Sequence, residues 1–216
     1  MLPRNRYLLP AISALLAIAL VGVLVLGASK GGHSTAGRAS GFDGAAIPGD
    51  VKAPDFTLSA QDGRAVSLSS YRGRVAVLVF LAAGAPSGLD ATCRTCVLVA
   101  QQVRGALDEL ESHPPPKADT RAIFVSGELP ARGSPNRLLA QTSLSTRAEY
   151  LTGDGVGVGR VWRAYRIALP AANDSKAEAA TTVVLIDRRG FERVAFGIEQ
   201  ITPESLSHDI GLLEGS

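Results

Sequence analysis

The chain has 216 residues, of which 46% are hydrophobic and 19% are charged, and its formal net charge is +2. This composition excludes a disordered charged tail, and the length suffices for one domain with a hydrophobic core. The whole excess of positive charge arises before Val51, where four basic residues are opposed by two acidic ones. The neutral remainder argues against nucleic-acid binding, which needs clustered positive charge.

The first predicted element is an uncharged, apolar segment at residues 7–29. About 20 helical residues span the ~30 Å hydrocarbon core of a bilayer, and Arg4 and Arg6 favour an inside N-terminus. We therefore expect residues 1–29 to form a cytoplasmic N-terminus and a single transmembrane anchor in the plasma membrane. A cleaved signal peptide is the alternative, although the apolar core of such peptides usually has only ~7–15 residues. Both interpretations place the following domain on the extracytoplasmic side.

Residues 30–50 are predicted to form a flexible tether, because they consist mainly of Gly, Ser, Ala and Thr. A flexible chain of about 20 residues has a root-mean-square reach of ~25 Å. The domain, predicted at residues 51–216, can therefore approach a partner in the same membrane.

The domain is predicted to begin with a hairpin, formed by residues 53–58 and 65–68 around an Asp62-Gly63 turn signal. Next, Val75–Leu81 has seven consecutive apolar residues, which is typical of a strand covered on both faces. A loop at 82–90 then leads to an amphipathic helix that ends before the prolines at 114–116. The apolar face of this helix consists of Val99, Val103, Ala106, Leu107 and Leu110.

The second half of the domain is predicted to continue with alternating strands and helices. The expected elements are a strand at 121–126, helices at 135–141 and 158–165, and strands at 181–186 and 191–196 around a turn. A last helix is expected after Thr202 as its cap, with Pro203 at its first position. The order of hairpin, β-α-β unit, helices and final β-β-α unit is the layout of an α/β thioredoxin-like sandwich.

The only two cysteines, Cys93 and Cys96, form a Cys-Arg-Thr-Cys motif where the helix after the apolar strand is expected to begin. The first turn of a helix has unpaired N–H groups and a positive dipole end. A thiolate at this place is stabilised, so the pKa of the thiol should lie below the ~8.5 of a free cysteine. Arg94 adds a positive charge. We predict a catalytic, redox-active pair in which Cys93 attacks and the deeper Cys96 resolves the mixed disulfide.

Other interpretations of the pair fit the sequence less well. A structural staple around four residues would stabilise the fold by only about 2 kcal/mol. Structural zinc needs four ligands, and peroxide reduction would need a Pro-x-x-x-Thr-x-x-Cys spacing that this chain lacks. Copper remains an alternative, because Cu(I) prefers thiolates and needs fewer ligands. Cys93 and Cys96 would then be metal ligands together with an unidentified third ligand.

Between residues 53 and 213 the chain resembles the Sco/SenC branch of the thioredoxin-like superfamily. The matching segments are APDFTLSAQDGRAVSLSSYRGRVAVLVFL, the cysteines that open a helix, YLTGDGVGVGRVWRAYRI and TTVVLIDRRGFERV. The resemblance implies a membrane-anchored, extracytoplasmic protein that carries copper to the CuA centre of cytochrome oxidase or keeps its cysteines reduced. The implied partners are extracytoplasmic protein thiols, including those of an oxidase subunit.

The family's copper ligands are two cysteines in a Cys-x-x-x-Cys motif and a distant histidine. The cysteines carry over to Cys93 and Cys96, with one residue fewer between them. The histidine does not carry over, because residues 178–182 before the final strand pair are Glu-Ala-Ala-Thr-Thr. The three histidines of this chain are instead expected at the surface: His33, His113 and His208.

Three functions therefore remain open. A thiol–disulfide oxidoreductase needs no histidine, although Ala180 stands where thioredoxin-like reductases usually carry a cis-proline. A Cu(I) chaperone without enzymatic activity would use the same two thiolates. A redox-inactive interaction module tethered to the membrane would use neither thiol exchange nor copper binding.

Overall fold

The computed structural model describes residues 41–49, 51–82, 93–113, 119–126, 135–170 and 177–215. All of them belong to one compact unit, Ala36–Ser216. The expected anchor at 1–29 and the beginning of the expected tether lie outside these ranges. Within the described ranges, no helix is both long enough and apolar enough to cross a bilayer.

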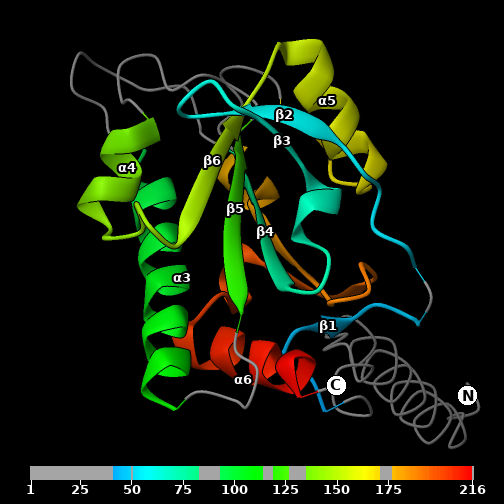
Figure 1. The fold of residues 1–216 in the computed structure, drawn as a ribbon, viewed down its shortest axis with the longest axis vertical. Coiled ribbons are helices and arrows are strands. Elements are labelled where there is room, and N and C mark those ends of the chain that lie inside the picture. Colours follow the sequence, from blue (N-terminus) through cyan, green and yellow to red (C-terminus); the bar gives the residue numbers. More distant parts are fainter. Residues whose placement is uncertain are drawn as a thin grey trace, which may run out of the picture. The chain divides into compact units, whose positions relative to one another are not determined.

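One mixed sheet forms the centre of this unit (Figure 1). Its eight strands are β1 (Ala45–Ala46), β2 (Thr57–Ala60), β3 (Ala65–Ser67), β4 (Val75–Leu81), β5 (Thr120–Ser126), β6 (Ala148–Thr152), β7 (Thr182–Ile186) and β8 (Glu192–Gly197). Their order in space is β1-β8-β7-β4-β5-β6-β2-β3. The pairs β4–β5 and β5–β6 are parallel, whereas all other neighbours are antiparallel.

Helices cover both faces of the sheet, which confirms the predicted α/β sandwich. The helices are α3 (Arg94–Ser112), α4 (Pro135–Gln141), α5 (Gly155–Ala164) and α6 (Pro203–Glu214), and short 3₁₀ turns lie at η2 (Leu68–Tyr71), η3 (Ala177–Ala180) and η4 (Ile198–Gln200). Odd-numbered residues of β4 share a core cluster with α3, α4 and α6. Even-numbered residues of β4 share the other cluster with α5. Because all seven side chains of β4 are buried, this strand fits only between two layers of helices.

Two elements in the middle of the chain differ from the predictions. The sequence analysis did not predict β6, whose five residues show no regular alternation and which is held between β5 and β2. Helix α5 begins at Gly155, earlier than predicted, because the Asp154 carboxylate accepts a hydrogen bond from the Gly157 N–H. A Cβ atom on Gly157 would lie 2.6 Å from an Asp154 carboxylate oxygen, so glycine permits this close cap.

The folded domain begins before residue 51, where the sequence analysis placed its boundary. Strand β1 pairs with β8, and the N–H groups of Asp43 and Gly44 donate to the two carboxylate oxygens of Asp209 at 2.8 and 3.0 Å. A Cβ atom on Gly44 would lie 2.5 Å from a methyl group of Val194, so the backbone can approach this closely only at a glycine. From Asp43 onward, the expected tether is therefore part of the folded domain, and its residues Ala45 and Ala46 are part of the sheet. Two alanines in a Gly-Ala-Ser-rich stretch carry no pattern that would have predicted this.

We expect the substitution Asp209→Asn to release residues 43–46 from the sheet. A carboxamide has one acceptor oxygen instead of two, so one of the two buried N–H groups loses its partner, which costs about 1–3 kcal/mol. Amide hydrogen exchange at Gly44 should accelerate by roughly tenfold or more for this free energy, whereas exchange in β4 should not change. The exposed side chain of Asp43 provides the control substitution Asp43→Asn. Equal protection of Gly44 in both variants would contradict the prediction.

Candidate functional site

The two cysteines lie together at the start of α3. A disulfide of 2.06 Å joins their sulfurs, and their Cα atoms are 5.2 Å apart. Cys93 is the N-cap of the helix, and its Sγ accepts a hydrogen bond of 3.1 Å from the N–H of Cys96. The structure thus brings together the two residues that the sequence singled out. Their pairing follows from the helix itself, because residues three apart in the first turn face the same side.

The two sulfurs differ in accessibility. Cys96 is 6% exposed and belongs to the core cluster that contains Leu81 and Val99. Cys93 is half-buried and packs against the edge of that cluster. Cys93 is therefore the more accessible of the two cysteines. The greater depth of Cys96 agrees with the sequence analysis, whereas the attacking and resolving roles of the two sulfurs stay a prediction.

The electrostatic surroundings favour negative charge on Cys93. Helix α3 has 19 residues and no acidic residue in its first turn, so its positive dipole end is not neutralised there. The exposed Arg94 directly follows Cys93. In the disulfide, the N–H of Cys96 donates to the Cys93 Sγ, and a contact of this kind is one that would stabilise a thiolate.

Two threonines take the place where the family histidine was expected. The register of β4 and β7 ends at the pair Phe80 and Thr182. Beyond it, the Thr181 hydroxyl oxygen accepts a hydrogen bond of 3.2 Å from the Ala82 N–H, and the Thr182 hydroxyl donates one of 3.0 Å to the Ala180 carbonyl. The side chains thus satisfy backbone groups where the two strands separate. Sequence reasoning overlooked this role, although two adjacent threonines at the start of a strand were the available signal.

The histidines do not complete a copper site in the part of the chain that the structure describes. His113 and His208 are exposed, as predicted, and His33 lies outside the described ranges. The one cluster there of at least three potential metal ligands consists of Asp43, His208 and Asp209, and includes neither cysteine. The donor set at the cysteines is therefore two sulfurs. After reduction, two thiolates fit Cu(I), which accepts few and soft ligands, better than Cu(II).

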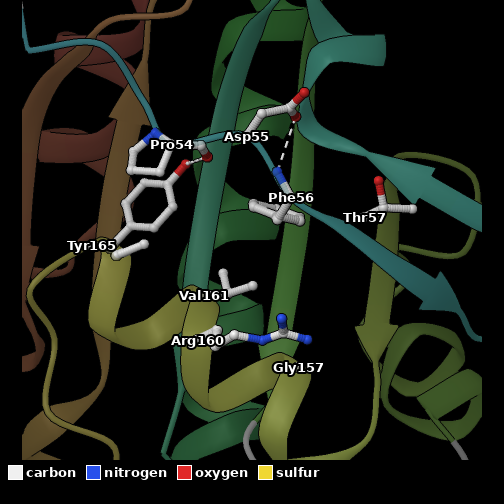
Figure 2. Close-up of a pocket in the computed structure, with 9 residues that line it drawn as sticks. Pro54, Asp55, Phe56, Thr57, Gly157, Arg160, Val161 and Tyr165 are labelled. Atoms are coloured by element: carbon white, nitrogen blue, oxygen red, sulfur yellow. Dashed lines mark hydrogen bonds between the residues drawn. The ribbon is translucent and has the colours of Figure 1, made fainter.

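A cavity of about 350 Å³ lies between α5 and the segment before β2. Figure 2 shows that Phe56, Tyr165 and Arg160 line it. The Tyr165 hydroxyl donates a 3.0 Å hydrogen bond to the Pro54 carbonyl, and burial raises the pKa of this tyrosine. The cavity belongs to the face of the sheet that packs on α5, opposite to the face that packs on α3. Because it contains no cysteine, we assign it no part in the thiol chemistry.

Glu192, at the start of β8, is a buried carboxylate whose charge contributes to the raised pKa of Tyr165. Only 1% of Glu192 is exposed. Its Oε2 accepts a 2.8 Å ion-pair hydrogen bond from Arg166, while its Oε1 has no hydrogen-bond partner among the described residues. Burial raises the pKa of Glu192, and the Arg166 charge opposes this shift only in part.

We expect Glu192→Gln to flatten the pH dependence of stability. A raised pKa means that the native state holds the proton more tightly than the unfolded chain. The resulting stability is complete below the unfolded-state pKa and is lost as pH rises through the higher folded-state pKa. Glutamine is neutral at every pH. The variant should therefore not lose this stability as the pH rises, and at neutral pH it should be at least as stable as the parent protein. Urea unfolding between acidic and neutral pH measures this, with the exposed Glu111→Gln as control. If the free energy of unfolding of the variant depended on pH as steeply as that of the parent protein, the prediction would be contradicted.

Comparisons with known proteins support the fold and the family. The SCO1/SenC family model matches residues 45–211. Among solved structures, BsSco, described as a member of the Sco family of cytochrome c oxidase assembly proteins with a disulfide switch, is similar at 17% identity with a TM-score of 0.59. That alignment covers 77% of this chain and 95% of the other. No curated protein sequence matches significantly.

Two further structures resemble this chain over most of their length. Copper-bound ScoI of Arabidopsis thaliana is 16% identical with a TM-score of 0.57, and the alignment covers 76% of this chain and 97% of that one. Apo Sco1 of Thermus thermophilus is 19% identical with a TM-score of 0.58, and the alignment covers 80% and 96%, respectively. At these identities the similarity establishes the thioredoxin-like fold.

Proposed function

Because this chain belongs to the SCO1/SenC family, we propose that it is an extracytoplasmic thiol–disulfide oxidoreductase in the maturation of cytochrome oxidase. The observation that carries the proposal is the Cys93–Cys96 disulfide at the start of α3, in which a half-buried sulfur is bonded to a buried one. A staple needs no accessible sulfur, whereas thiol exchange does.

The exchange proceeds in two balanced steps. A client thiolate attacks the Sγ of Cys93, a client–Cys93 disulfide forms, the Cys93–Cys96 bond breaks, and Cys96 leaves as a thiolate. A second client thiolate then attacks the client sulfur of the mixed disulfide, and Cys93 leaves as a thiolate. The client dithiol is thereby oxidised and the protein is reduced. In the reverse direction, Cys93 attacks a client disulfide and Cys96 resolves the mixed disulfide.

The N-terminal segment is proposed to hold the domain at the plasma membrane, with the transmembrane anchor at residues 1–29. Since Phe42 packs against the core, the Gly41 carbonyl lies 3.1 Å from a ring nitrogen of His208, and Asp43 and Gly44 are bound to Asp209, the proposed tether is limited to about residues 30–40. For this length the root-mean-square reach is roughly 20 Å. A client thiol must therefore lie close to the membrane surface, as expected for an oxidase subunit.

Delivery of Cu(I) is the second candidate, and the two-sulfur donor set favours it. Copper would be the cargo, bound by Cys93 and Cys96 after reduction. Copper-bound relatives, such as ScoI of Arabidopsis thaliana, support this alternative. The absence of a histidine beside the sulfurs within the described ranges restricts the proposal to Cu(I). A redox-inactive, membrane-tethered interaction module is the third alternative.

The midpoint potential of the cysteine pair, measured with and without copper, tests these functions against one another. An oxidoreductase should show a reversible two-electron transition in both cases. If the transition disappears with Cu(I), and the reduced protein withholds one equivalent from a strong Cu(I) chelator, copper carriage is favoured. If the thiols and the disulfide do not interconvert reversibly, the oxidoreductase proposal fails; if the reduced protein also does not withhold Cu(I) from the chelator, copper carriage fails too and the interaction module remains.

A further inference from the structure

An exposed stripe on α3 begins beside the accessible sulfur. It consists of Arg94, Val97, Leu98 and Gln101, of which Val97 is half-buried and the other three are exposed. Leu98 is 51% exposed and is the one large hydrophobic residue of α3 that points to solvent. Arg94 lies one helical turn before it, so both side chains share a face. We call these four residues the α3 stripe.

The α3 stripe carries a positive charge that no described acidic residue balances. Arg94 forms no ion pair within the described ranges. The first acidic residue of α3 is Asp108, near the other end of the helix, and its carboxylate is already paired with Arg104 and Arg147. Among the described residues, the exposed surface of α3 that follows Cys93 is therefore apolar and positively charged. An exposed leucine beside an unpaired arginine complements a partner that offers an apolar side chain and a carboxylate.

We propose that the α3 stripe docks a polypeptide segment whose cysteine is flanked by an apolar and an acidic residue. This inference rests on the proposed thiol–disulfide exchange and specifies its partner. Leu98 lies about 7.5 Å along the helix axis from Cys93 and about 140° around it, at 1.5 Å per residue and 3.6 residues per turn, so a partner must wrap over Arg94 to reach both. An extended partner chain rises ~3.3 Å per residue. Partner residues two or three positions from the attacking cysteine can therefore contact Leu98 and Arg94.

The test uses the oxidised full-length chain and two synthetic peptides, each with one cysteine, a leucine two residues away and either glutamates or lysines around them. The measured quantity is the rate of mixed-disulfide formation per peptide thiolate, in which Cys93 gains the peptide sulfur and Cys96 is released as a thiolate. The glutamate peptide should react about 2- to 5-fold faster than the lysine peptide, which is the range of an exposed charge pair. Dithiothreitol serves as the small reductant that needs no docking.

The variants separate docking from chemistry. Arg94→Glu should reverse the preference between the two peptides, and Leu98→Ser should slow both by about 5-fold, as expected for losing roughly 40 Å² of apolar contact. Leu98→Ser should not slow dithiothreitol. The matched control lies on α5, where Val156 and Arg160 are also an exposed apolar residue and an arginine one turn apart. Val156→Ser and Arg160→Glu should change neither the rates nor the preference.

Each other outcome decides against the proposal. Equal effects of the α3 and α5 variants, or no preference between the peptides while dithiothreitol reacts, would overturn the docking surface and leave the thiol chemistry standing. If even dithiothreitol fails to open the Cys93–Cys96 disulfide, the proposed function fails, and the docking inference fails with it.

Discussion

Replacement of Cys93 by serine is expected to abolish disulfide exchange, whereas replacement of Cys96 by serine should leave a protein that traps its client. Without Cys93, the remaining sulfur is buried, with 6% exposure, and a client cannot reach it. Loss of the attacking group should slow exchange by at least about 10³-fold. Without Cys96, the mixed disulfide at Cys93 has no resolving thiol, so it should accumulate. Non-reducing electrophoresis with a client that carries a disulfide measures both results, because the free thiolate of each variant can form a mixed disulfide only by breaking a client disulfide and releasing its other sulfur as a thiolate.

The two variants control for each other. Both lose the same four-residue cross-link, worth about 2 kcal/mol in the chain-entropy estimate, so a difference in trapping cannot come from a difference in the cross-link. Because Cys93 is more accessible than Cys96, trapping of the client is expected in Cys96→Ser and not in Cys93→Ser. If Cys93→Ser trapped client and Cys96→Ser did not, the assignment of the attacking sulfur would be reversed. If neither variant formed a mixed disulfide, the thiol chemistry itself would be wrong.

Elements with strong local signals were predictable from the sequence. The uninterrupted apolar run of β4 and the apolar face of α3 each specify an element and its burial. The last helix was predicted from its cap, and the Thr202 hydroxyl does accept a hydrogen bond from the Ser205 N–H at 3.2 Å. The position of the two cysteines could be predicted in the same way. A helix must begin between the buried strand and the apolar helix face that follows it, and the cysteines lie in this interval.

Features that depend on distant partners were not predictable. Asp43 and Asp209 meet across a separation of 166 residues, and Asp119 and Glu214 meet across 95. Nothing in the sequence of α6 distinguishes its buried carboxylates from the exposed Glu204. Strand β6 was missed for the same reason, because its burial comes from β5 and β2 rather than from its own pattern. The replacement of a histidine by threonines was visible, but not the hydrogen bonds that Thr181 and Thr182 make.

Glu214→Ala is expected to destabilise the domain by about 3–5 kcal/mol, the range for removing one partner of a buried ion pair. The Glu214 side chain is fully buried. Its Oε1 accepts hydrogen bonds from the Asp119 N–H at 2.9 Å and from the Thr120 hydroxyl at 2.6 Å, and its Oε2 accepts one from Arg188. Alanine leaves these part-buried donors without this acceptor. Urea unfolding measures the loss, and the exposed Glu204→Ala on the same helix should cost under about 1 kcal/mol.

This destabilisation should leave the thiol chemistry of the folded protein unchanged. Glu214 lies beside Leu107 and Leu110 in the C-terminal half of α3, whereas the cysteines lie at its N-terminus, about 24 Å away along the helix axis. Substitutions this far apart without shared partners usually act independently. Below the unfolding transition, Glu214→Ala should therefore retain the parent rate of exchange with dithiothreitol and the parent midpoint potential. A shifted potential in the folded variant would show that α6 also controls the start of α3, and the site could no longer be treated as a local property of that helix end.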